Sequence, residues 1–99
     1  MKHFLLFYDF IPDYIERRAP LRPEHFKFAR AAQARGELVL GGALADPVDS
    51  AVLLFVGDSR TVAESFARED PYVRNGLVTA WRVSEWTPVA GADALTTVP

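Results

Sequence analysis

Hydrophobic and polar positions follow two different patterns along the chain. Four segments of strand length cover residues 3–9, 37–44, 51–57 and 77–86. In the last segment, Leu77, Trp81 and Val83 fall on one face, and Arg82 and Ser84 fall on the other. The first and third segments are almost entirely apolar. Such runs, among them HFLLFYD and AVLLFVG, are typical of strands that are covered on both faces. The pattern therefore predicts a sheet of four strands.

Another segment follows the period of a helix. It begins at Pro23, a residue favoured in the first helical turn, and ends at Gly36, a natural C-cap. Residues 10–23, which connect it to the first strand, contain three prolines and are predicted to be irregular.

A second helix is predicted before the last strand. Asp58 or Ser59 is expected to cap it, and Pro71 ends it because proline disfavours helical geometry at Asp70. Its core-facing stripe consists of Val62, Ala63, Phe66 and Ala67.

The order strand, helix, strand, strand, helix, strand predicts an α+β fold. Two βαβ halves joined in this way form a ferredoxin-like βαββαβ plait, in which a four-stranded antiparallel sheet carries both helices on one face. The other face is then uncovered although its strands are apolar, and a monomer would expose an unusually large hydrophobic patch. We therefore expect a homodimer formed through the sheet face.

Composition narrows the class of protein. The 99 residues are 49% hydrophobic with a net charge of −2, which fits one globular domain and gives no electrostatic footprint for nucleic acid. The chain has no cysteine and two histidines, which disfavours a thiolate nucleophile and a dedicated metal site. We expect no cofactor.

The chain ends complete the domain assignment. We expect a single domain over residues 1–99, with a core at about 3–86 and a tail at 87–99 that is either frayed or pinned by a partner chain. The N-terminal apolar run is cut by Asp9 and is a poor signal peptide, and no segment reaches the roughly 20 apolar residues of a membrane helix. These features predict a cytoplasmic protein that does not bind membranes.

His25 is the residue whose placement calls for an explanation. At about 100° per residue it shares a helix face with Phe28, Ala29 and Ala32, while Arg30 points elsewhere. A histidine there is either a satisfied core or interface residue or a functional one. The positive end of the helix dipole disfavours imidazolium, so a neutral ring in this turn can serve as a general base.

Asp70 is the candidate partner of His25. It lies in the break between the second helix and the last strand, where a helix stop and turn explain it equally well. The topology of the plait does not by itself bring Asp70 to His25. Gly41 and Gly42 are similarly ambiguous, since they mark either a bulge or a close approach of a ligand to the backbone.

Several motifs in order resemble the YCII-related (YciI-like) family over roughly residues 3–86. They are ERRAPLRPEHF with Arg18, Arg22 and His25, then GGAL, then DPYVRNGL with Asp70 and Tyr72, and a closing strand that ends in Trp86. The chain departs from the family where Gly42-Ala43 replaces the common Gly-Pro, and where DSAVLL lacks a glycine before the third strand.

The resemblance implies a ferredoxin-like dimer of the dimeric α+β barrel type. It also implies a His–Asp dyad in a cleft, carried here by His25 and Asp70. One family member is associated with dehydrochlorination of a chlorinated hydroquinone, and the fold is shared with muconolactone isomerase.

Other residues complete the predicted site. Arg18 and Arg22 either hold an anionic or phenolate substrate or solvate a loop. Tyr72 either donates a hydrogen bond to the substrate or packs against Pro71, and Tyr8 is a candidate wall residue. His3 is expected to be a solvated strand end.

Two functional hypotheses follow. The first is a lyase or isomerase that uses the dyad for acid–base proton transfer on a small cyclic or aromatic-derived compound. The alternative is a non-catalytic module of the same fold that binds a metabolite or a partner protein.

Overall fold

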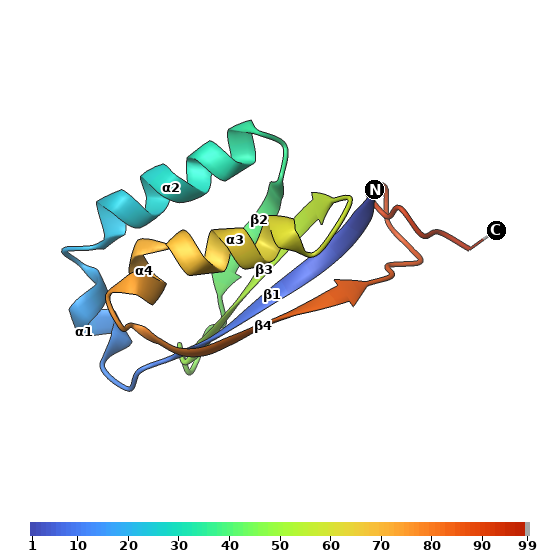
Figure 1. Ribbon diagram of the computed structural model, residues 1–99. Coiled ribbons are helices and arrows are strands. Elements are labelled where there is room, and N and C mark those ends of the chain that lie inside the picture. Colours follow the sequence, from blue (N-terminus) through green and yellow to red (C-terminus); the bar gives the residue numbers. More distant parts are fainter. Residues whose placement is uncertain (99) are drawn as a thin grey trace.

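The computed structural model describes residues 1–98, which fold into one sheet with helices on one of its faces (Figure 1). Within these residues the strands are β1 (Lys2–Phe10), β2 (Leu38–Ala43), β3 (Ser50–Gly57) and β4 (Val78–Trp86), and the helices are α1 (Tyr14–Arg18), α2 (Arg22–Ala34), α3 (Thr61–Glu69) and α4 (Pro71–Arg74). The strands are antiparallel in the order β2-β3-β1-β4. The predicted ferredoxin-like plait is confirmed.

The short helices α1 and α4 were not predicted. The expectation of an irregular segment over residues 10–23 was wrong, because α1 occupies part of it. Pro71 does end α3, since Asp70 is extended with ψ 126°, but Pro71 then begins α4 at once. Elements of five and four residues are too short to show a hydrophobic period.

The ends of the longer helices follow local chemistry only in part. Gly36 follows α2 with a φ of +78°, a conformation that glycine adopts without strain. The capping position of α3 is Arg60, which makes no side-chain cap, so the predicted cap was misplaced. Ser59 lies one residue earlier, and its hydroxyl accepts the backbone N–H of Thr61 at 3.4 Å.

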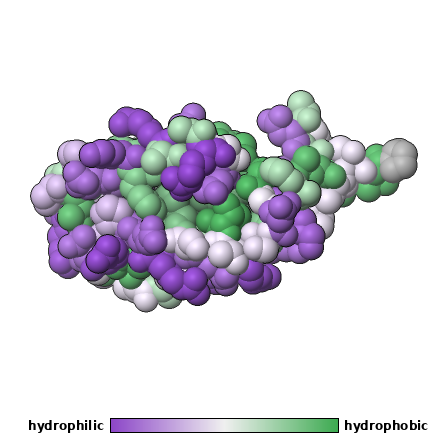
Figure 2. Space-filling model, turned by 45° about the horizontal axis from the view of Figure 1, so that its top comes forward, coloured by the Kyte–Doolittle hydropathy of each residue, from purple (hydrophilic) through white to green (hydrophobic). Residues whose placement is uncertain are grey.

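The core lies between the sheet and the helices. Alternate residues of β1 and β3 are buried there, namely Phe4, Leu6, Tyr8, Ala51, Leu53 and Phe55. Phe66 of α3 joins the layers, because its ring centroid lies 4.7 Å from that of Phe28 on α2 and 5.1 Å from that of Phe55. Seen from the helical side, the surface is largely hydrophilic, with hydrophobic residues visible between the polar ones (Figure 2).

The opposite face of the sheet carries no helix (Figure 1). Leu5 of β1 pairs with Leu54 of β3, and Phe7 pairs with Val52, and all four side chains are partly exposed. Leu40 of β2 is 70% exposed beside them. An apolar face therefore remains open in this chain.

His3 is not a solvated strand end, and that prediction was wrong. Its side chain is buried, because the C-terminal segment lies beside the N-terminus (Figure 1) and covers it. His3 Nε2 lies 3.1 Å from the carbonyl oxygen of Asp93 and 3.1 Å from the backbone nitrogen of Leu95. This part of the tail is pinned by its own chain. Over the residues that the structure describes, no helix is long and apolar enough to cross a bilayer.

The position of Phe66 predicts a large effect on stability. Phe66→Ala should lower the free energy of unfolding by about 3–5 kcal/mol, because it removes the contact between α2, α3 and β3. Urea unfolding followed by circular dichroism measures the change. Phe26→Ala is the control, since Phe26 is 36% exposed and should cost much less. Equal losses in both variants would contradict the packing described here.

Candidate active site

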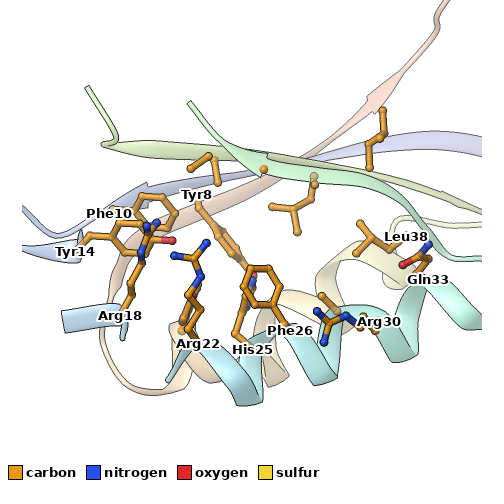
Figure 3. A pocket seen from close by; sticks show the side chains of 18 of the residues that line it. Tyr8, Phe10, Tyr14, Arg18, Arg22, His25, Phe26, Arg30, Gln33 and Leu38 are labelled. Atoms are coloured by element: carbon orange, nitrogen blue, oxygen red, sulfur yellow. The ribbon is translucent and has the colours of Figure 1, made fainter. Parts of the chain in front are cut away.

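A cavity of about 560 Å³ lies between α2 and the β2 side of the sheet (Figure 3). Residues of α1 and α4 also line it, so the two unpredicted helices are part of its wall. The side chains that matter for its chemistry are Tyr8, Arg18, Arg22, His25, Arg30 and Tyr72. The cavity is therefore built from segments that are distant in the sequence.

The side chain of Asp70 lies behind this cavity and is fully buried. Its Oδ1 accepts the N–H of Tyr72 at 3.0 Å and lies 2.8 Å from Nδ1 of His25, while its Oδ2 accepts the hydroxyl of Tyr8 at 2.8 Å. The Tyr72 contact is a local consequence of chain geometry, because Asp70 is the N-cap of α4. The structure thus joins the two residues whose separation the topology left open.

His25 lies between Asp70 and the cavity. A carboxylate accepts hydrogen bonds, so the contact assigns a ring proton to Nδ1, and in the neutral form of the ring Nε2 then carries none. Within residues 1–98 Nε2 has no hydrogen-bond partner, and the side chain is 14% exposed and lines the cavity. The ring also stacks on Tyr72 at 3.8 Å between centroids and 7° between planes. Both contacts hold the imidazole in one orientation.

The tyrosines beside His25 and Asp70 stay protonated. Burial, and then the charge of Asp70, raises the pKa of Tyr8 far above its usual value, so Tyr8 acts as a fixed donor to Asp70. Burial, and then Tyr14, raises the pKa of Tyr72 to about 12, although Arg22 and Arg18 oppose the shift. Tyr8 had been expected only as a wall residue, and a lone tyrosine in a strand gives no sign of such a contact.

Arg18 and Arg22 both line the cavity, on the side of α1 (Figure 3). The guanidinium carbon of Arg18 lies 5.3 Å from the centroid of Tyr14, and that of Arg22 lies 5.1 Å from the centroid of Phe26. Across the described chain, neither forms an ion pair with a carboxylate. Their charge is therefore available to an anion in the cavity.

Arg30 lines the same cavity, although it lies off the helix face that Phe28 and Ala32 share. Phe28 and Ala32 of α2 pack toward the core, whereas Arg22, Phe26 and Arg30 occupy the neighbouring face that borders the cavity. His25 lies at the boundary of the two faces. The periodicity of a sequence identifies the apolar face of a helix. It does not show that a polar face of the same helix borders a cavity.

The glycines of β2 form the wall opposite α2. The register shifts between Leu38 and Leu40, so a bulge precedes Gly41 and Gly42, and both glycines line the cavity. A side chain at Gly41 would meet Leu53 at 3.2 Å. In the described part of the chain, no group of three or more histidine and carboxylate side chains could hold a metal ion.

Several solved structures share the fold of this chain. A dehydrochlorinase of 5-chloro-2-hydroxyhydroquinone from Burkholderia phenoliruptrix, solved in complex with 2,5-dihydroxybenzoquinone, is 22% identical with a TM-score of 0.71, over 85% of this chain and 92% of its own. A protein of Agrobacterium tumefaciens is 11% identical with a TM-score of 0.59, over 96% and 98% of the two chains. An antibiotic biosynthesis monooxygenase is 14% identical with a TM-score of 0.54, over 91% and 100%. At these identities the likeness concerns the fold alone.

Sequence comparison identifies the family. No curated protein sequence matches the chain significantly. The family model of the YCII-related domain matches residues 1–87, which include both members of the His25–Asp70 pair. The chain therefore belongs to the YCII-related family.

Proposed function

We propose that this protein is a small-molecule enzyme of the lyase or isomerase type, with His25 and Asp70 as its acid–base dyad. The observation that carries the proposal is the 2.8 Å contact between Asp70 Oδ1 and His25 Nδ1, on a ring that lines the cavity. The substrate class is a small cyclic or aromatic-derived compound. The aromatic side chains around the arginines suit a planar, anionic ligand.

The first step is proton abstraction. Nε2 of His25 takes a proton from a carbon next to a carbonyl, or from a hydroxyl, and the electron pair of the broken bond moves onto the substrate oxygen. Asp70 stabilises the imidazolium that forms, as the carboxylate of a catalytic triad does. Arg18 and Arg22 stabilise the negative charge that develops on the substrate, and the hydroxyl of Tyr72 is a further donor to it.

The second step decides the reaction type. In an isomerase, His25 returns its proton to a different substrate atom. In a lyase, the electron pair of the substrate reforms the carbonyl or a double bond and expels a leaving group with its bonding electrons. The structurally similar dehydrochlorinase supports the second route by analogy, since loss of a proton and of chloride is an elimination of this kind.

The alternative is a non-catalytic module that binds an anionic metabolite. The favourable observation is that Arg18 and Arg22 are unpaired within the described residues and would attract an anion without any chemistry. A binding module needs the arginines and not the proton transfer. Substitution of His25 therefore separates the two functions.

We also propose that a second copy of the chain covers the open sheet face, on which Leu5, Phe7, Val52 and Leu54 lie. These side chains form an apolar surface of the kind that a homodimer buries. A cytoplasmic location suits the cysteine-free sequence and stays a prediction.

The dyad predicts a large loss of turnover when His25 is removed. With a panel of hydroxylated, chlorinated and enol-lactone ring compounds, His25→Asn should lower kcat/KM for any substrate found by about 10²–10⁴-fold, the usual contribution of acid–base catalysis. Asp70→Asn should lower kcat as well. His3→Asn is the matched control, because His3 lies outside the cavity lining. Full activity of folded His25→Asn protein would refute the dyad.

The Asp70 contact also predicts the tautomer of His25. Nitrogen NMR of the neutral ring should show a protonated Nδ1 and a bare Nε2 in the wild type. In Asp70→Asn the amide replaces one acceptor oxygen by a donor, and the populations of the two tautomers should change. Unchanged tautomer populations of His25 in Asp70→Asn would show that the contact is absent in solution.

The open face predicts the oligomeric state. The wild-type chain should sediment as a dimer, and Leu54→Lys should yield a folded monomer because it places a charge in the interface. Ser65→Lys, on the exposed side of α3, should remain dimeric. A monomeric wild type in analytical ultracentrifugation would contradict the proposed dimer.

A further inference from the structure

The cavity continues along α2 well beyond His25. Arg22, Phe26 and Arg30 follow one another at intervals of four residues, and all three line it. The guanidinium carbons of Arg22 and Arg30 lie 5.1 and 5.5 Å from the centroid of Phe26. Figure 3 shows Arg22 reaching toward the sheet near Tyr8, whereas Arg30 lies farther along α2 on the other side of His25.

The spacing along the helix measures this extension. At about 1.5 Å per residue, Arg30 lies roughly 7.5 Å and Gln33 roughly 12 Å along the axis from His25. Gln33 also lines the cavity and lies near Leu38 (Figure 3). The volume of about 560 Å³ falls in the range of pockets that enclose drug-sized ligands. A single six-membered ring at His25 would leave the Arg30 end empty.

The Arg30 end is charged and uncompensated. Arg30 forms no ion pair with a carboxylate anywhere in residues 1–98, and Asp70, whose carboxyl oxygens are both engaged, is not in the cavity lining. The chain as a whole is acidic, with a net charge of −2, yet both ends of this cavity carry guanidinium groups. Such a local excess of positive charge concentrates anions and selects ligands with matching charges.

We propose that the ligand of this site is an elongated dianion with one negative group at each end. Arg18 and Arg22 bind the end next to His25, where the reacting atoms lie if the proposed function holds. Arg30 binds the second anionic group, a carboxylate for which a guanidinium fork is well matched, and the amide of Gln33 donates to the same group. Arg30 then determines specificity without taking part in proton transfer.

Rigid aromatic acids test the two-ended site directly. The probes are biphenyl-4,4′-dicarboxylate and biphenyl-4-carboxylate, which share one frame and differ by one anionic group, and binding is measured by isothermal titration calorimetry. The wild type should bind the dicarboxylate about 10- to 100-fold more tightly, as expected for one charge-assisted hydrogen-bonded pair. Arg30→Gln should abolish this preference and leave the monocarboxylate affinity unchanged, and Arg30→Lys should restore part of it.

Arg35→Gln is the matched control, because Arg35 is paired with Glu37 at 3.0 Å and is absent from the cavity lining. It should leave the preference intact. Equal affinity of the wild type for both probes, no binding of either, or an equal loss of both affinities in Arg30→Gln would overturn the inference.

The probe-binding experiment and the turnover experiment test the two proposals separately. A two-ended preference that persists in folded protein without His25-dependent turnover would support the anion sites and refute the enzyme. His25-dependent turnover together with equal affinities for the two probes would refute the elongated dianion and leave the dyad standing.

Discussion

The buried carboxylate of Asp70 is the constraint on which the site depends. A charge without solvent is costly unless hydrogen bonds replace its hydration, and Asp70 receives them from the backbone of Tyr72, from Tyr8 and from His25. These donors belong to α4, β1 and α2, so one side chain ties both helical segments to the central strand. Loss of any donor would leave part of a buried charge unpaired. This cost favours the orientation of His25 in which its ring donates to Asp70.

The fold makes this arrangement by a break in one helix. Pro71 forces Asp70 out of helical geometry, and the next turn restarts as α4 with Asp70 as its cap. With the chain in this conformation, the carboxylate of Asp70 contacts His25 of α2 and Tyr8 of β1. The ring of Tyr72 stacks on that of His25. A single Asp-Pro step therefore both stops a helix and directs the carboxylate to His25. The structural explanation of that dipeptide is confirmed, and the functional one belongs to the proposed dyad.

The charge of the cavity differs from that of the molecule. Arginines line it along α1 and α2 although the chain is acidic overall, and burial keeps the tyrosines beside the dyad protonated. This combination provides donors and positive charge where the proposed reaction would develop an anion, and an imidazole where it would remove a proton. It is equally suited to holding an anionic product, which is why substitution of His25, and not of an arginine, separates catalysis from binding.

The sequence by itself determined the plait, because four segments of strand length and two amphipathic helical segments, in that order, leave few ways to bury a core. It also marked His25 as unusual and placed Asp70 at a helix stop. Only the tertiary structure brought these residues within 2.8 Å, added Tyr8 to the network, moved Arg30 into the cavity and buried His3 under the tail. The physical reason is range: periodicity and capping act over a few residues, whereas each of these contacts depends on how separate elements pack.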